Sequence, residues 1–484
     1  MEKKINSQII KELFSKSADI LVRPITLNQN NITFHVFCVD GLVDAELLDN
    51  ALLKPLVFDR FIGNYITESQ VIDYLLYRGS YETFTTLETD YDKLIKAVLS
   101  GQAAFIFDAE AKALVFDIRS FDKRSISEPN EEGTIKGAKD SFIEVMRTNT
   151  ALIRRRIRSE YLVCEHHVVG DVSKTDVVLC YISNIANMDT VNKIRDIIKS
   201  IKIDNVPTSA FIEEYLNPNK KSLFPQVMYT QRPDRVSSNL SDGRIAIIVD
   251  GVPFVFVLPC QLVMLMQSPE DYANHFFVGS ALRILRYISM IVTLFLPAFY
   301  IAATTYQNQM LPMKLALSTQ AAKANVPFSS ATEVLGLLLA FEILIEAGLR
   351  LPKAVGTAMS ILGGIVVGQS AVSANILSPL VVVIVSLAGI AGFIVPNQDL
   401  SSGIRVIRFV FAILAAIGGF FGLTAVIIIL LVHLCSLDNY GVAYLSPFVD
   451  IDVSNQKDTL FRFPIRFFKN RPDNIAPENI TKQS

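Results

Sequence analysis

The chain has 484 residues, with 45 lysines and arginines against 47 aspartates and glutamates, and a formal net charge of −2. A nucleic-acid-binding surface needs a positive field, so this balance argues against that class of protein. Hydrophobic residues make up 51% of the chain and concentrate after Tyr287. The composition therefore predicts a soluble first half and a membrane-embedded second half.

The first half is predicted to be α/β, in two subdomains. Alternating or short apolar runs that end in turn residues indicate strands, and amphipathic runs indicate helices. The expected strands lie within 31–44, 101–118, 176–186 and 243–259, and the expected helices cover 47–56 and 190–201. The polar stretch Glu128–Gly137 separates the subdomains. We expect segments 1–130, 131–282, 283–448 (membrane helices) and 449–484 (a polar cytosolic tail).

The stretch "RTNTALIRRRIRSEYL" places four arginines close together, namely Arg154, Arg155, Arg156 and Arg158. On a helix Arg154 and Arg158 share a face, while Arg155 and Arg156 point elsewhere, so the charge does not form one phosphate-binding stripe. Acidic residues are plentiful nearby, at Glu131, Glu132, Asp140, Glu144 and Glu160. We expect Arg–carboxylate pairs with a structural or subunit-contact role rather than nucleic-acid binding.

No catalytic or metal-binding pattern is evident in the sequence. The adjacent His166 and His167 would face opposite sides of a strand, which makes them a poor metal site. The five cysteines are scattered and predict neither disulfides nor a metal site. The first 30 residues carry charges throughout, so we expect no signal peptide. We expect no enzyme activity and no cofactor.

Four membrane spans are expected from uncharged runs, and a fifth is left open. The first run is Tyr287–Met313, with Pro297 inside it and Arg283 and Arg286 before it as a cytoplasmic flank. The run Ala354–Pro396 is too long for one helix and is read as two spans separated near Asn375. The run Phe409–Val432 is the fourth.

The fifth segment, 331–350, carries Glu342, Glu346 and Arg350 at steps of four, hence on one helical face. It is either an interfacial amphipathic helix or a span whose acidic face lines a protein interior or a water-filled path, since exposed carboxylates in lipid are costly.

The span after Ala354 is rich in small and polar residues, which suits either tight helix packing or the lining of a pore. The two roles are compatible in an oligomer. The pore-lining candidates are Gly363, Gly364, Val366, Val367, Gly368, Gln369 and Asn375.

Several stretches in order along the chain resemble the A subunits of spore germinant receptors, the GerA family. They are "GSYETF", "ISEPNEEGTIKGAKDSFIEVMRTNTALIRRRI", "FPQVMYTQRPDR", "GRIAIIVDGVPF", "EAGLRLPKAVGTAMSILGGIVVGQSAVSANILSP" and "HLCSLDNYGVAYLSP". Two of these stretches supply Arg232, Asp234 and Asp250 as further structural or subunit-contact candidates. Gln231 and the Asn439-Tyr440-Gly441 run depart mildly from the family pattern.

The resemblance implies a multi-pass protein of the spore inner membrane with its N-terminal half in the cytosol, or spore core. It implies a transporter-like B subunit and a lipoprotein C subunit as partners, and self-association into an ion-conducting path that opens when a nutrient is sensed. A stage V sporulation AF-like paralogue is similar over the same stretches. A solute transporter is a further alternative, disfavoured because the membrane half shows no internal repeat.

Overall fold

The computed structural model describes residues 4–27, 32–58, 65, 67–79, 85–120, 132–134, 136–352, 364, 366–449 and 453–482. It divides into two compact units. The sheet unit comprises Met1–Lys220, Val227–Pro259 and Arg466–Ser484, and the helical unit comprises Lys221–Gln226 and Cys260–Ile465. The four segment boundaries drawn from the sequence stay a prediction.

The first sheet of the sheet unit has five antiparallel strands in the order β1-β2-β4-β5-β3. Their bounds are β1 Ile20–Thr26, β2 Thr33–Val39, β3 Thr85–Glu88, β4 Ala103–Phe107 and β5 Lys112–Phe116. The helical segments around them are α1 Ser7–Leu13, α2 Ala45–Leu47, η1 Leu48–Leu53, α3 Lys54–Phe58, α4 Glu68–Tyr74, η3 Leu75–Gly79 and α5 Tyr91–Leu99.

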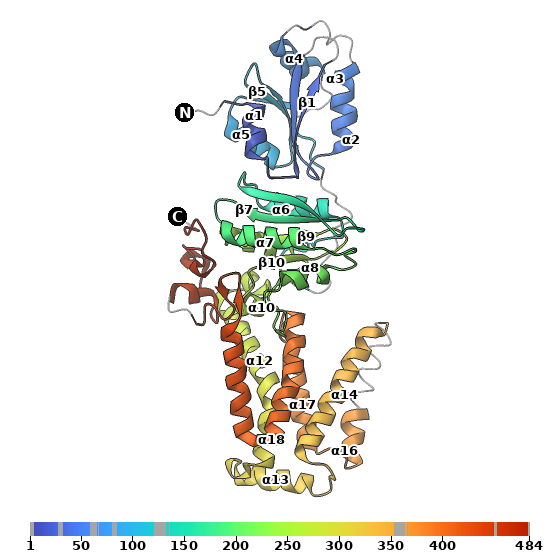
Figure 1. Cartoon of the computed structure of the whole chain (residues 1–484), viewed down its shortest axis with the longest axis vertical. Helices are drawn as coiled ribbons and strands as arrows, with labels where there is room; N and C mark the ends of the chain where they lie inside the picture. The colour runs from blue at the N-terminus through green and yellow to red at the C-terminus, as the bar shows by residue number, and fades with distance from the viewer. Residues whose placement is uncertain are drawn as a thin grey trace. The chain divides into compact units, whose positions relative to one another are not determined.

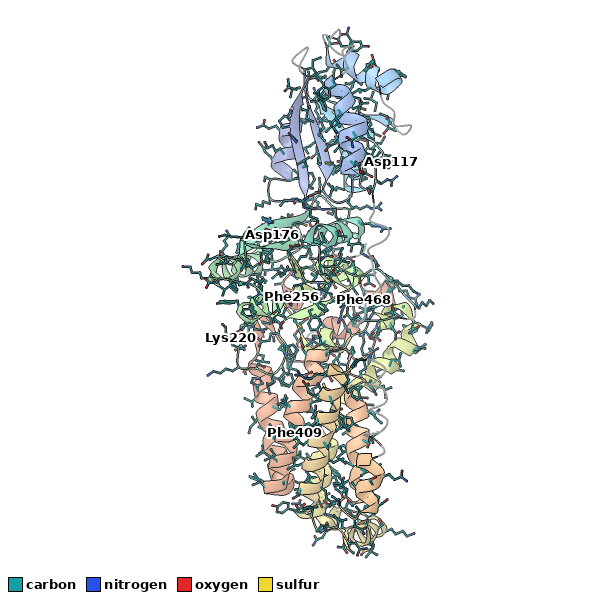
Figure 2. The ribbon with its side chains drawn as sticks, turned by 90° about the vertical axis from the view of Figure 1, so that its right-hand side faces the viewer. Asp117, Asp176, Lys220, Phe256, Phe409 and Phe468 are labelled. Atoms are coloured by element: carbon teal, nitrogen blue, oxygen red, sulfur yellow. The ribbon has the colours of Figure 1, made fainter. Side chains whose placement is uncertain are left out.

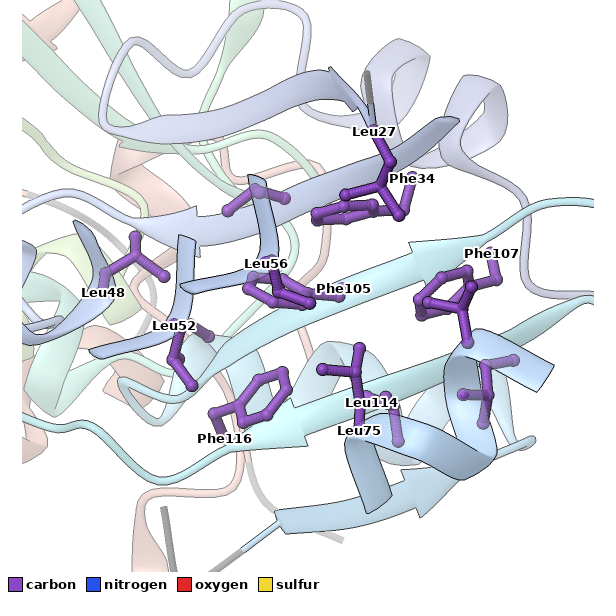
Figure 3. Close-up of a cluster of buried hydrophobic side chains, with 14 of the residues drawn as sticks. Leu27, Phe34, Leu48, Leu52, Leu56, Leu75, Phe105, Phe107, Leu114 and Phe116 are labelled. Carbon is purple, nitrogen blue, oxygen red and sulfur yellow. The ribbon is translucent and has the colours of Figure 1, made fainter. Parts of the chain in front are cut away.

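The inner strands of this sheet, β2, β4 and β5, are buried on both faces because their residues alternate between two apolar clusters. Phe105 packs with Leu52 and Leu75 of the helical segments on one face, as Figure 3 shows. The next residue, Ile106, packs with Leu94 of α5 on the other face. The expected strand pair around Asp108 is therefore confirmed as β4 and β5.

The second sheet repeats the plan, with antiparallel strands in the order β6-β7-β9-β10-β8. Figure 1 labels β7, β9 and β10 of this sheet. The strands are β6 Leu162–Val169, β7 Thr175–Ile182, β8 Met228–Thr230, β9 Ile245–Val249 and β10 Val255–Leu258. The helices are α6 Met146–Arg156, α7 Met188–Ser200, α8 Ser209–Leu216 and α9 Pro233–Ser241. The hairpin predicted at Asp250-Gly251 joins β9 to β10, and Gly251 supplies the positive φ of +80° that its turn requires. The α/β character predicted for this half is confirmed.

The helical unit is built around α12 Phe276–Thr305, which continues through Pro297. The other elements are α10 Leu262–Met266, α11 Glu270–Ala273, η4 Asn308–Met310, α13 Met313–Lys323, α14 Ser330–Arg350, η5 Val366–Ser370, α16 Ala371–Ser373, α17 Pro379–Gly392, α18 Gln398–Ser436, β11 Asp438–Asn439, β12 Val442–Ala443 and η6 Val453–Asp458. Of the described helices, α12 and, counted over its whole length, α18 are long and apolar enough to cross a membrane, and α17 is apolar but shorter. Four or five spans are therefore not confirmed.

Helix α18 is a hairpin of two helical arms, not one straight rod. Gly419 has non-helical angles, φ 58° and ψ −137°. A Cβ at Gly403 would lie 2.6 Å from the Leu223 carbonyl oxygen, and His433 Nε2 lies 3.0 Å from Ser222 Oγ. Both ends of α18 thus lie beside one short segment, although a straight helix would separate Gly403 from His433 by about 45 Å.

The turn at Gly419 corrects the span predicted at Phe409–Val432. The chain reverses there, so the arms are 398–418 and 420–436, and Phe409, labelled in Figure 2, belongs to the first arm. A side chain at Gly422 would collide with the Leu414 carbonyl of that arm. The Tyr306 hydroxyl holds the turn from the end of α12 by donating to the carbonyls of Ala416 and Ile417, at 3.0 and 2.8 Å.

Candidate functional site: buried ion pairs of the helical unit

A carboxylate of α14 pairs with two arginines of α18. Arg408 Nη2 donates to Glu342 Oε1 at 2.8 Å, and Arg405 Nη1 donates to Glu342 Oε2 at 3.2 Å. Arg408 is fully buried and Glu342 is partly buried. In an apolar helical bundle, an ion pair such as this holds two helices in one register, since separating the charges would leave each without a counter-ion.

The three residues predicted on the acidic face of 331–350 therefore divide. Glu342 faces a protein interior, which one of the two alternatives for this segment included. Glu346 and Arg350 instead form an i,i+4 pair at 2.7 Å with side chains 60% and 79% exposed. One face of the helix thus carries an interior ion pair at one level and a surface pair one turn later.

A second polar cluster surrounds Glu333 at the start of α14. Glu333 is buried, and its Oε2 accepts a hydrogen bond of 2.7 Å from the backbone N–H of Ser378. Its Oε1 lies 3.5 Å from Lys323 Nζ of α13, and Lys323 also donates to Ser330. Lys323 lines a cavity of about 200 Å³ together with Thr304, Asn308, Thr319 and Gln320. The helical unit therefore holds a buried carboxylate cluster between α13, α14 and the turn before α17, and Lys323 of this cluster also borders a cavity between α13 and the end of α12.

The third cluster lies at the start of α12 and is called here the α12 ion-pair cluster: Arg283, Arg286, Arg462, Asp271 and Asp458. Asp271 Oδ2 accepts from Arg286 Nη1 at 2.7 Å and from Arg283 Nε at 3.3 Å. Arg283 Nη1 also donates to Asp458 Oδ1 at 2.8 Å. Arg462 Nη1 donates to the carbonyls of Asp271 and Asn274, both at 2.7 Å.

This cluster changes the interpretation of Arg283 and Arg286. The sequence placed them in a cytoplasmic flank, where positive charges report topology. Both are instead buried against Asp271, so they bind α11 to α12 and no longer support an orientation of the first span. Sequence patterns do not indicate the partner Asp271, because it lies outside every uncharged run.

The predicted pore-lining residues are only partly described. Gly363 lies outside the described residues, and of Val366 and Val367 only the backbone, in η5, is described. Gly364, Gln369 and Asn375 are exposed within a single chain, and a Cβ at Gly368 would meet Val382 of α17 at 3.8 Å. Asn375 has a positive φ of 57° in the turn before α17. Their role in a pore stays a prediction.

In the sheet unit, Arg154 is fully buried and forms a bidentate pair with Asp19. Arg154 Nε and Nη2 donate to the two carboxylate oxygens of Asp19, each at 2.9 Å, and Nη1 donates to the Leu162 carbonyl at 3.0 Å. Asp19 precedes β1, so this pair connects the two sheets. The expectation of a local acidic partner is wrong for Arg154, because the helix turns this side chain inward.

The other members of the arginine run lie nearer the surface. Arg156 Nη2 pairs with Asp140 at 2.6 Å, one of the local acids that the sequence indicates. Arg155 is exposed. Helix α6 ends at Arg156, so Arg158 does not share a helical face with Arg154 as predicted; its Nε donates to the Arg155 carbonyl at 3.3 Å.

Arg232, Asp234 and Asp250 also make contacts within the chain. Buried Arg232 pairs with Asp234 at 2.8 Å and donates to the carbonyls of Glu132 and Ala138. It thereby fastens the polar stretch after the first sheet. Asp250 accepts a hydrogen bond of 3.1 Å from the backbone N–H of Met146, at the start of α6. A structural role inside one chain is compatible with each of these contacts.

Glu165 on β6 accepts hydrogen bonds from two neighbouring side chains of the sheet unit. Arg195 of α7 donates to it at 2.7 and 2.8 Å, and the Tyr181 hydroxyl donates at 2.6 Å. Burial alone would raise the pKa of Glu165, but the neighbouring His167, Arg195 and Tyr181 outweigh it and hold the pKa well below its usual range. His166 points away from this cluster and pairs with Asp176 at 2.9 Å.

Among the described residues, no group of three or more His, Cys, Asp or Glu side chains lies close enough to hold a metal ion. The polar side chains of the helical unit are instead arranged as ion pairs between helices. Such pairs can fix helix positions, and they can exchange partners if the helices move.

Comparison with known proteins identifies the family. The sequence model described as Bacillus/Clostridium GerA spore germination protein matches residues 8–474. Spore germination protein KA of Bacillus subtilis (strain 168) is 37% identical over 98% of this chain and 86% of the relative. Spore germination protein GerLA of Bacillus cereus is 32% identical over 98% of this chain and 95% of the relative.

A solved structure is also similar. It is the crystal structure of the N-terminal domain of the A subunit of the Bacillus megaterium spore germinant receptor GerK3, which is 28% identical, with a TM-score of 0.42. The match covers 54% of this chain and 99% of that one. Since the family model spans nearly the whole sequence and the relatives match along almost their full length, the chain belongs to the GerA family of spore germination proteins.

Proposed function

We propose that this chain is the A-type subunit of a nutrient germinant receptor and that copies of it assemble into an ion-conducting path in the spore inner membrane. The family match over residues 8–474 is the observation that carries the proposal. The apolar helices α12 and α18 support a membrane location. In this proposal the chain works without catalysis, beside a transporter-like B subunit and a lipoprotein C subunit, with the sheet unit in the spore core.

The path itself is assigned to residues 363–375. Gln369 and Asn375 are polar and exposed in the single chain, although they lie in a segment expected to sit in lipid. Polar groups in lipid need a partner or water, and neighbouring copies of the chain around an axis would supply one. Val366 and Val367 would then form the narrow apolar constriction.

The Glu342–Arg408 pair is assigned the role of a latch between α14 and α18 in the closed state. Breaking a buried ion pair by removing one partner costs about 3–5 kcal/mol. A latch of that strength would bias the closed state strongly, because about 1.4 kcal/mol already changes an equilibrium tenfold. Nutrient binding elsewhere in the complex would have to offset this difference.

The test measures ion release from spores in which this chain is replaced by single variants expressed at equal levels. Val367→Phe should slow nutrient-triggered release, whereas Val383→Phe, on the exposed face of α17, should leave it unchanged. Equal release in both would refute the pore assignment.

The latch has a separate test. Glu342→Gln should raise release without nutrient, and Arg408→Gln should raise it as well, since either change breaks the same pair. If Glu342→Gln leaves nutrient-independent release at its original level in a stably expressed protein, the pair is only structural.

A further inference from the structure

A short segment near the end of the helical unit displays apolar side chains where a polar tail was expected. Phe461, Phe463 and Ile465 are 55%, 44% and 59% exposed, and Leu460 is exposed as well. Arg462 between them is buried. The segment 460–465, called here the aromatic segment, is therefore held through one inward arginine and turns its apolar side chains outward.

Its position is set by contacts with the first turns of α12. The backbone N–H of Arg462 donates to Ser280 Oγ at 2.9 Å, and the Arg462 guanidinium binds the Asn274 carbonyl. Phe277 is 71% exposed one turn before Ser280. The aromatic segment and Phe277 thus lie at the end of the helix that is long and apolar enough to cross a membrane.

The exposed surface of α12 continues from this end as an apolar stripe. After Val278 the exposed large apolar residues of α12 are Leu285, Ile288, Ile291 and Phe299, spaced so as to fall on one helical face. A lipid-facing stripe of a spanning helix has this composition, and aromatic side chains gather where such a stripe leaves the hydrocarbon. Continuity with the stripe thus favours lipid as the occupant of the aromatic surface.

Charge indicates which lipid. Arg466 and Lys469, both exposed, follow the aromatic segment directly in the chain, and Phe468 between them is labelled in Figure 2. Alternating aromatic and basic residues are typical of segments that lie at the surface of an anionic bilayer, because the basic side chains are attracted to the negative headgroups.

We propose that the aromatic segment, with Phe277, lies in the headgroup layer of an anionic lipid bilayer and anchors the start of α12 there. The proposal rests on the membrane location in the proposed function. It makes the segment 460–465 a lipid-binding surface rather than part of a solvated tail. Because Arg462 contacts Asp271 and Ser280, the position of the aromatic segment in the headgroup layer would affect the position of the α12 ion-pair cluster.

The chain contains no tryptophan, so a single introduced tryptophan reports its own surroundings without background. Full-length Phe461→Trp and Phe463→Trp, reconstituted in vesicles of phosphatidylcholine with phosphatidylglycerol, should each emit at shorter wavelength than in water. Lipids brominated near the headgroup should quench both more than lipids brominated near the chain ends. Ile291→Trp should be quenched by the deep bromines, and Val172→Trp, in an exposed turn of the sheet unit, by neither.

The control variants distinguish the lipid-binding surface from the membrane location on which it rests. Quenching at Ile291→Trp without quenching at either phenylalanine position would overturn the lipid-binding surface while leaving the membrane location intact. No quenching at Ile291→Trp would overturn both. If the phenylalanine variants emit at short wavelength but resist every brominated lipid, the surface is covered by protein instead and the proposal fails.

A separate experiment tests the preference for anionic lipid. In Phe461→Trp, adding Arg466→Gln and Lys469→Gln should remove the difference in quenching between vesicles with and without phosphatidylglycerol. A difference that persists unchanged would overturn the preference for anionic lipid.

Discussion

The two units of the chain use buried charge differently. In the sheet unit, Arg154 and Asp19 match each other through two parallel hydrogen bonds, and the remaining Nη1 of Arg154 is satisfied by backbone carbonyls. In the helical unit, buried charged atoms lack a hydrogen bond within the described residues, namely Asp271 Oδ1, Arg283 Nη2, Glu333 Oε1, Arg405 Nε, Arg408 Nε and Arg462 Nε.

The Arg154–Asp19 pair has its hydrogen bonds filled, whereas several charged groups of the helical unit could each form a further hydrogen bond. A charge whose hydrogen bonds are complete has nothing to gain by moving, whereas an incompletely bonded one can accept water, an ion or a new side chain. The helical unit is therefore where a change of state would cost least in lost hydrogen bonds. The predictions below test how far that contrast holds.

The largest effect is expected at the α12 ion-pair cluster. Asp271→Ala would leave Arg283 and Arg286 buried without the carboxylate that they share, which should cost about 3–5 kcal/mol. In detergent-purified full-length protein this should lower the thermal midpoint by about 10 °C. The exposed pair provides the control, since Glu346→Ala should change stability by about 1 kcal/mol or less. Equal shifts in the two variants would contradict the burial argument.

Next in size is the pair between the two sheets. Asp19→Ala should destabilise the sheet unit by about 3 kcal/mol, because Arg154 would stay buried without its counter-ion. Replacing both, as Asp19→Leu with Arg154→Met, should recover most of that loss. Hydrogen exchange of the β1 and β6 amides in the full-length protein measures both. A double variant as unstable as the single one would show that the hydrogen bonds between Arg154 and Asp19 stabilise the sheet unit beyond neutralising the two buried charges.

Sequence patterns predict most of the sheet unit because its signals are local. The β4–β5 pair follows from two apolar runs separated by a polar turn at Asp108, and the β9–β10 hairpin from apolar runs around the Asp250-Gly251 turn. The partner of Arg154 could not be predicted, since Asp19 lies 135 residues away and only the fold brings the two together. The run of arginines identified the family but not the contacts.

The helical unit was harder to predict for a different reason. A search for uncharged runs begins the last span at Phe409, just after Arg405 and Arg408, and so leaves out the residues that pair with Glu342. The signal was present as two arginines three apart beside an apolar run, facing a segment with a glutamate. The hairpin at Gly419 carries no such signal, because Gly418-Gly419 in an apolar run is equally compatible with a continuous helix.

Gly419 gives a prediction whose sign decides between those two structures. In the hairpin, Gly419→Ala introduces a Cβ at positive φ and 2.9 Å from the Tyr306 ring, which should cost about 1–3 kcal/mol. In a continuous helix the same change would stabilise by about 1 kcal/mol. Gly418→Ala is the matched control, since a Cβ there meets nothing within 4 Å. Thermal unfolding in detergent distinguishes the outcomes, and a stabilised Gly419→Ala would refute the hairpin.

The smallest effect is expected at Glu165, whose pairing with Arg195 and Tyr181 should appear as acid sensitivity. The native pKa of this carboxyl is held below its usual range, so its contribution is present above the unfolded pKa of about 4.3 and is lost as pH falls below that value. Glu165→Gln should cost about 1 kcal/mol at neutral pH, since the group is only partly buried, and should flatten the loss of protection between about pH 5 and pH 3.

Hydrogen exchange of the β6 and β7 amides in the full-length protein reports this slope locally. The exposed Glu46→Gln serves as the control and should leave the slope unchanged. If Glu165→Gln retains the full slope, another carboxylate carries the acid sensitivity of the sheet. The contrast with the helical unit would then rest on the Arg154–Asp19 pair alone.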